Sequence, residues 1–111
     1  MSDNVREIEI DIDACKEVID LMRALDNLWD HPDFKKVIRE GYFETFAASL
    51  VMQKAQPGLQ EAAQQAGISK SIDAIGELYE YFRGVKHRGM MAQKSLADHE
   101  QTREELLAEE V

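Results

Sequence analysis

Apolar residues recur along most of the chain at steps of three and four positions, the spacing of one face of an α-helix. One stripe runs from Asp13 to about Asp30, a second from Pro32 to about Gln56, and a third over residues 69–85. These stripes predict three amphipathic helices.

Proline and glycine mark the breaks between the stripes. Pro32 lacks an amide hydrogen and suits the first position of a helix, so we expect Asp30 or His31 to cap the second helix. The Pro57–Gly58 pair ends that helix.

The remaining segments have weaker patterns. Residues 59–66 predict a short helix closed by Gly67. A thin apolar stripe over residues 90–107 predicts a last helix, which either continues the third one as a single rod or bends at Gly89.

The first dozen residues have a different period, because Ile8, Ile10 and Ile12 alternate with acidic residues. Alternation is typical of a short strand or an edge-docking arm, so we predict an extended arm here. The alternative is a frayed lead-in whose isoleucines partly join the first helix.

The whole pattern predicts an all-α fold: a small bundle of about three to four helices with a long amphipathic C-terminal helix and a short extended N-terminal arm. The expected divisions are the N-terminal arm at 1–12, a helical domain at 13–97, and an acidic C-terminal tail at 98–111 that continues the last helix.

The charge is strongly acidic and unevenly distributed. The chain has 111 residues, of which 22 are Asp or Glu and 13 are Lys or Arg, for a net charge of −9. Such a surface repels phosphate backbones and argues against nucleic-acid binding.

A domain of this size also leaves much of its surface in water, so we expect a homo-oligomer.

The sequence offers no set of residues for catalysis, a metal or a cofactor, and we expect none of these. Cys15 is the single cysteine, it has apolar stripe neighbours, and the three histidines form no paired spacing. No apolar run approaches the length of a membrane span, and the first residues lack the pattern of a signal peptide. We therefore expect a cytoplasmic protein without a membrane partner.

Aromatic and methionine side chains are the first candidates for protein interaction. Trp29, Phe34, Tyr42 and Phe43 surround the junction of the first two helices. Such clusters are more often core than interface, but three short helices cannot easily enclose all of them. The adjacent residues Met90 and Met91 are further candidates, because methionine adapts to partner surfaces.

The second candidate is basic. Residues 83–97 contain no acid and four bases, among them Arg83, Lys86 and Arg88. These bases suit pairing with an acidic tail in the same or a neighbouring chain, with an acidic partner protein, or with nucleic acid.

Part of the chain resembles a set of small helical proteins from tailed bacteriophages. The residues that carry the resemblance are the stretch Ala24-Leu25-Asp26-Asn27-Leu28-Trp29-Asp30-His31-Pro32-Asp33-Phe34-Lys35-Lys36-Val37-Ile38, then Glu40-Gly41-Tyr42-Phe43, Leu50-Val51, Ile72-Asp73-Ala74-Ile75-Gly76-Glu77-Leu78 and Tyr81-Phe82-Arg83. The match covers roughly residues 20–107 and consists of packing and capping motifs. Ser49 stands where the related proteins have an arginine.

The resemblance implies a phage protein encoded among virion or assembly genes, without a catalytic residue set. The resulting hypothesis is a non-enzymatic virion component or assembly factor that docks on other virion or assembly proteins and on itself, in the host cytoplasm or the virion. The alternative is an acidic inhibitor that occupies the nucleic-acid site of a host protein.

Overall fold

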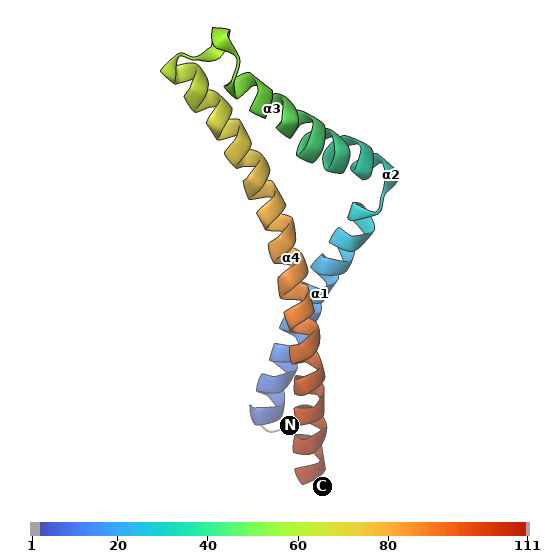
Figure 1. Cartoon of the computed structure of the whole chain (residues 1–111). Coiled ribbons are helices and arrows are strands. Elements are labelled where there is room, and N and C mark those ends of the chain that lie inside the picture. Colours follow the sequence, from blue (N-terminus) through green and yellow to red (C-terminus); the bar gives the residue numbers. More distant parts are fainter. Residues whose placement is uncertain (1–2, 111) are drawn as a thin grey trace. The chain divides into compact units, whose positions relative to one another are not determined.

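The computed structural model describes residues 3–110, and each regular element in this range is helical. Along the chain the elements are α1 (Asp3–Trp29), α2 (Pro32–Phe34), the π-helix η1 (Lys35–Phe46), α3 (Ala47–Lys54), the 3₁₀ turn η2 (Pro57–Leu59) and α4 (Ala62–Glu109). Because α2, η1 and α3 follow one another without a break, they form one helical segment over residues 32–54 (Figure 1). The predicted all-α class and the long last helix are confirmed.

Contacts divide the chain into two units. Unit 1 contains Met1–Asp26 and Gly84–Val111, and unit 2 contains Asn27–Arg83. Both α1 and α4 contribute residues to each unit. No helix in the described range is long and apolar enough to cross a membrane.

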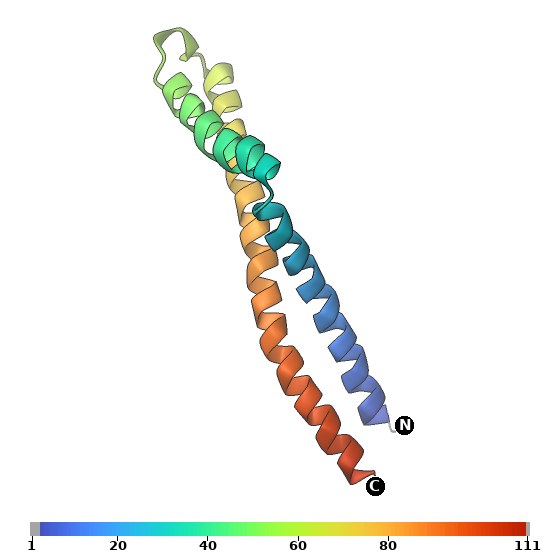
Figure 2. The ribbon, with the colours of Figure 1, turned by 90° about the vertical axis from the view of Figure 1, so that its right-hand side faces the viewer.

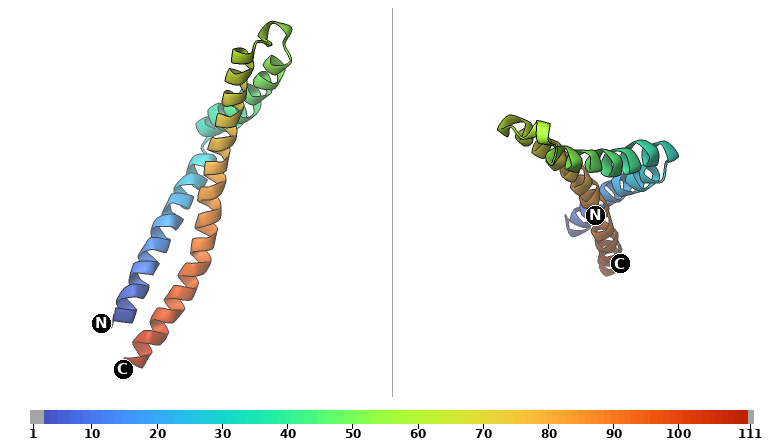
Figure 3. Two further views of the ribbon diagram at one scale, coloured as in Figure 1. Left: turned by 90° about the vertical axis from the view of Figure 1, so that its left-hand side faces the viewer. Right: turned by 45° about the horizontal axis from the view of Figure 1, so that its top comes forward.

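Unit 1 is an antiparallel pair formed by α1 and the C-terminal part of α4, so that the start of α1 lies beside the end of α4 (Figures 2 and 3). Its inward residues follow alternating steps of three and four, the heptad spacing of a coiled coil. On α1 the buried or half-buried residues of this seam are Val5, Ile8, Ile12, Cys15, Ile19 and Met22, and on α4 they are Val85, Gly89, Ala92, Leu96, His99, Arg103 and Leu106.

The predicted extended N-terminal arm is wrong for residues 3–12, which form the first turns of α1; Met1 and Ser2 lie outside the described residues. Ile8 and Ile12 are four residues apart and therefore share the helix face that contacts α4, whereas Ile10 points away and is 62% exposed. Pairing with α4 determines the helical conformation of these residues. The alternation of isoleucine with acidic residues does not produce a strand.

Gly89 sets how closely the two helices of unit 1 approach each other. It is buried, and a Cβ built on it would lie 2.6 Å from Cγ of Met22 and closer still to the Cβ and Sδ of that residue. Met22 itself packs with Ile19 and Ala92 in the local core. A large residue on α1 thus fills the space that a missing side chain leaves on α4.

Unit 2 contains the predicted break at Pro32. His31 caps the new helix with its side chain, since Nδ1 accepts a hydrogen bond from the amide of Asp33 at 3.1 Å, and Pro32 occupies the first turn. The hydrophobic core of this unit includes Leu50 of α3 together with Ile68 and Ile75 of α4.

The π-helix η1 explains which residues of the second helix face inward. An α-helix turns about 100° per residue, so Phe43 would lie on the opposite side from Phe34, nine residues earlier. A π-helix has i→i+5 hydrogen bonds and therefore more residues per turn than an α-helix, which brings Phe43 to the face of Phe34, where both rings contact Trp29. Two apolar residues of η1, Val37 and Phe46, are exposed.

Polar side chains close the turn between α3 and α4. The side-chain amides of Gln60 and Gln65 both donate to the carbonyl of Lys54, the last residue of α3, at 3.1 Å. Gln65 also donates to the carbonyl of Leu59 at 2.7 Å. These bonds satisfy carbonyl groups that the ends of α3 and η2 leave without helical partners.

The predicted short helix at 59–66 with Gly67 as its end is wrong, because α4 begins at Ala62 and continues through Gly67, Gly84 and Gly89. Each helical glycine costs about 1 kcal/mol relative to alanine. Packing in both units offsets this cost, so α4 remains helical through all of these glycines.

Replacing Gly89 with alanine should destabilise unit 1 by about 1–3 kcal/mol, because the added methyl group would collide with Met22. Gly76→Ala is the matched control: an added Cβ there has no atom within 4 Å, so this variant should be neutral or up to about 1 kcal/mol more stable. Denaturant unfolding followed by circular dichroism measures both. Equal effects of the two substitutions would contradict the close helix approach.

The π winding predicts unequal effects for two apolar residues of η1. Phe43→Ala should cost about 3 kcal/mol, whereas Val37→Ala, at a residue that is 63% exposed, should change stability by less than about 0.5 kcal/mol. An α-helical winding with Phe34 inward would make Val37 the more sensitive residue. Unfolding of the two variants therefore separates the two windings.

Candidate functional site

An aromatic cluster occupies the part of unit 2 where the end of α1, the 32–54 segment and α4 meet. Trp29 has its ring centroid 5.8 Å from that of Phe34, 6.4 Å from that of Phe43 and 6.0 Å from that of Phe82. Phe82 is also 5.9 Å from Phe34 and 6.2 Å from Phe43, in edge-to-face geometry. All four residues are half-buried. These aromatic side chains thus pack on one another, as aromatic pairs in a core do.

Arg39 joins this cluster, although its charged neighbours in the sequence suggest a solvated face. Its guanidinium lies 5.0 Å from the centroid of the Trp29 ring, and Nη1 donates a hydrogen bond to the Trp29 carbonyl at 3.2 Å. Trp29 is the last residue of α1, so the cation meets both an aromatic face and the negative end of a helix dipole. The sequence indicates that Arg39 lies beside Trp29 only if residues 35–46 are given π-helical rather than α-helical geometry.

The edge of the cluster is open to water. Tyr42 stacks on Phe46 at 5.8 Å, with an interplanar angle of 17°, and Phe43 meets Tyr79 edge-on at 5.5 Å. Phe46 and Tyr79 are exposed, and so is Tyr81 on the same unit. These three exposed residues, called the aromatic edge, each contact a ring of the cluster or the neighbouring Tyr42. Exposed aromatic side chains of this kind are enriched where proteins meet partners.

Two of the four basic residues of the 83–97 segment, Arg83 and Lys86, form ion pairs within their own units. In unit 2, Arg83 forms an ion pair with Glu80 at 3.0 Å, one helical turn earlier. In unit 1, Lys86 bridges to Asp26 of α1 at 2.9 Å. Neither acid belongs to the 98–111 tail. Exposed pairs of this kind contribute at most about 1 kcal/mol each.

Arg88, Met90 and Met91 surround Gly89 on α4. The Arg88 guanidinium folds back over Gly84, one turn earlier. Met90 and Met91 are 50% and 49% exposed, because Gly89 takes the inward position on this turn. Both methionines are therefore accessible on the outer side of unit 1.

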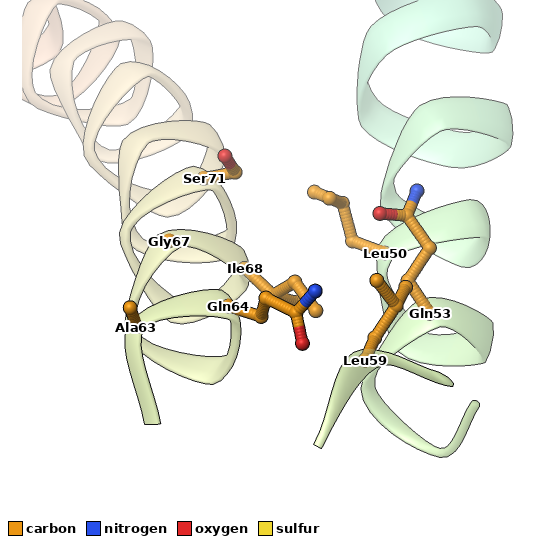
Figure 4. Close-up of a pocket in the computed structure, with 8 residues that line it drawn as sticks. All are labelled: Leu50, Gln53, Leu59, Ala63, Gln64, Gly67, Ile68 and Ser71. Carbon is orange, nitrogen blue, oxygen red and sulfur yellow. The ribbon is translucent and has the colours of Figure 1, made fainter. Parts of the chain in front are cut away.

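Unit 2 also contains an open pocket of about 400 Å³ between α3 and the start of α4 (Figure 4). Leu50 and Leu59 approach it from one side and Ile68 from the other, with the amide of Gln64 beside them. The sequence pattern gives no sign of this pocket. Its walls are apolar with a few amide and hydroxyl groups, which suits an apolar side chain and supplies no charged group for chemistry.

Reactive residue types are dispersed within the described range. No group of three His, Cys, Asp or Glu residues among positions 3–110 is arranged to hold a metal ion. Cys15 is half-buried and packs against the cluster of Ile19, Met22 and Ala92.

Comparisons with protein-family models, with curated proteins and with solved structures gave no match to this chain.

Replacing Trp29 with alanine should lower the free energy of unfolding by about 3–5 kcal/mol, because three ring contacts and the Arg39 contact disappear. Tyr81→Ala, at the aromatic edge, should cost about 1 kcal/mol or less. Thermal and denaturant unfolding check both values. A Trp29 variant of normal stability that fails to associate with a partner would make Trp29 an interface anchor instead of a core residue.

Proposed function

We propose that this chain is a non-enzymatic docking protein that associates with copies of itself and with other protein subunits through its helical faces. The observation that carries the proposal is the balance of exposed and buried apolar side chains. Twelve large hydrophobic residues of the described range are exposed, whereas nine hydrophobic residues are buried. Contiguous exposed apolar surface marks interaction sites, and the exposed neighbours Met90 and Met91, like Val51 and Met52, supply adjacent apolar side chains.

The exposed residues occur in both units. In unit 1 they are Ile10, Leu21, Met90, Met91 and Leu107, and in unit 2 they are Leu28, Val37, Phe46, Val51, Met52, Tyr79 and Tyr81. Each of them has a large part of its side chain in contact with water. Association with other chains would bury this surface, at a gain of roughly 25 cal/mol for each Å² of apolar area.

The resemblance to small helical proteins of tailed bacteriophages supplies the setting of the proposal. In that setting the chain is a virion component or an assembly factor, located in the host cytoplasm or the virion. Its partners are other virion or assembly proteins, which would contact the aromatic edge of unit 2 or the two methionines of unit 1.

A second candidate function, inhibition of a host nucleic-acid-binding protein, is favoured by the charge distribution. Unit 1 has 14 acidic and seven basic residues, so it carries −7 of the net −9. In this unit the acidic first half of α1 lies beside the acidic end of α4 (Figure 2). Such a concentration of carboxylates suits a phosphate-binding groove. Recovery of a nucleic-acid enzyme from host lysate, with binding lost at high salt, would favour this function.

The oligomeric mass tests the docking proposal. Light scattering after size exclusion should give a mass above the 12.7 kDa of one chain at low salt: a defined multiple for a closed assembly, or a mass that rises with protein concentration for an open one. Repetition at high salt shows whether charge or apolar burial dominates the association. A chain that stays monomeric at the highest concentration and binds no virion subunit would contradict the proposal.

A further inference from the structure

The outer side of α1 in unit 1 has a second apolar line, away from the seam with α4. It contains Ile10, Ala14, Leu21 and Ala24, whose separations of three, four and seven residues place them on one helix face. All four are exposed, and Leu21 is 51% exposed. Pairing with α4 alone does not require apolar residues at these positions.

Acidic residues accompany this line. Glu17 lies within it, and Asp13 and Asp20 lie beside it. Lys16 and Arg23 lie more than 90° around the helix axis from the centre of this apolar line. Between positions 10 and 24, the outer face of α1 is therefore apolar and negative.

The outer side of α4 in the same unit has the opposite charge. Met90 and Met91 lie on either side of the direction that points away from the seam, and Lys94 lies between them. Lys94 is exposed, and residues 84–97 contain no acid. Over these residues the outer face of α4 is therefore apolar and positive.

We propose that the outer face of α4 in one copy docks on the outer face of α1 in a second copy of this chain. Two α1 faces would bring carboxylates together, and two α4 faces would bring ammonium groups together; each arrangement is repulsive. Only the combination of α4 with α1 joins apolar surface and also pairs unlike charges.

The geometry also decides the type of assembly. The two faces point away from the seam in opposite directions, so one pair of copies cannot use both contacts at once. The association is head-to-tail, and it produces a ring if the rotation closes or an open chain if it does not. This inference rests on the proposed self-association and identifies the two helix faces that would form its interface.

Charge reversal at the centre of each face tests the interface. Lys94→Glu makes both outer faces negative, and Glu17→Lys replaces the central acid of the α1 face with a base. Each variant alone should associate about three- to tenfold more weakly than the wild-type chain at low salt, because an attractive pair becomes a repulsive one. An equimolar mixture of the Lys94→Glu and Glu17→Lys variants should recover much of the association, because every contact between the two different variants again pairs an acid with a base.

The matched controls are Lys36→Glu and Glu44→Lys, which make the same charge changes at exposed residues of unit 2. Sedimentation velocity measures association, and circular dichroism confirms that each variant is helical. Controls that weaken association as much as the unit 1 variants, or a mixture that stays dissociated, would overturn the inference while leaving self-association in place. A wild-type chain that is monomeric would overturn the proposed self-association itself.

Discussion

The contact between Gly89 and Met22 is the constraint on which unit 1 depends. A side chain at position 89 would force the two helices apart, so the absence of one allows the backbone of α4 to approach α1 closely. Ala92 continues the same arrangement, since it packs with Ile19 and Met22. Large residues on α1 meet small residues on α4, which fixes the register and leaves the outer faces of both helices in water.

The helices of unit 2 pack on one another in a different way. Its helical segments meet through aromatic rings around Trp29, and the π winding of η1 is what brings Phe34 and Phe43 to the same side. The same winding gives Arg39 its position over Trp29 and at the end of α1. It also turns Val37 outwards. The conformation of η1 therefore determines both the core of unit 2 and part of its exposed apolar surface.

The sequence predicts the fold and the candidate surfaces wherever local chemistry decides them. The helical class follows from spacing, and the restart at Pro32 follows from capping by His31. The extended arm is wrong because the alternation around Ile10 is a local signal, whereas α1 is stabilised by a helix from the other end of the chain. The aromatic cluster around Trp29 is recognisable because several of its residues lie close together in the sequence. The ion pair of Lys86 with Asp26 joins residues 60 positions apart, so no local pattern indicates it.

The close pairing of α1 and α4 within one chain is the central claim, because the free outer faces follow from it. Nuclear Overhauser effects between the Met22 side chain and the Gly89 α-protons, recorded on a mixture of isotopically labelled and unlabelled chains, test it most directly. The structure predicts strong effects within the labelled chain. Effects that are absent, or that occur only between labelled and unlabelled chains, would contradict it.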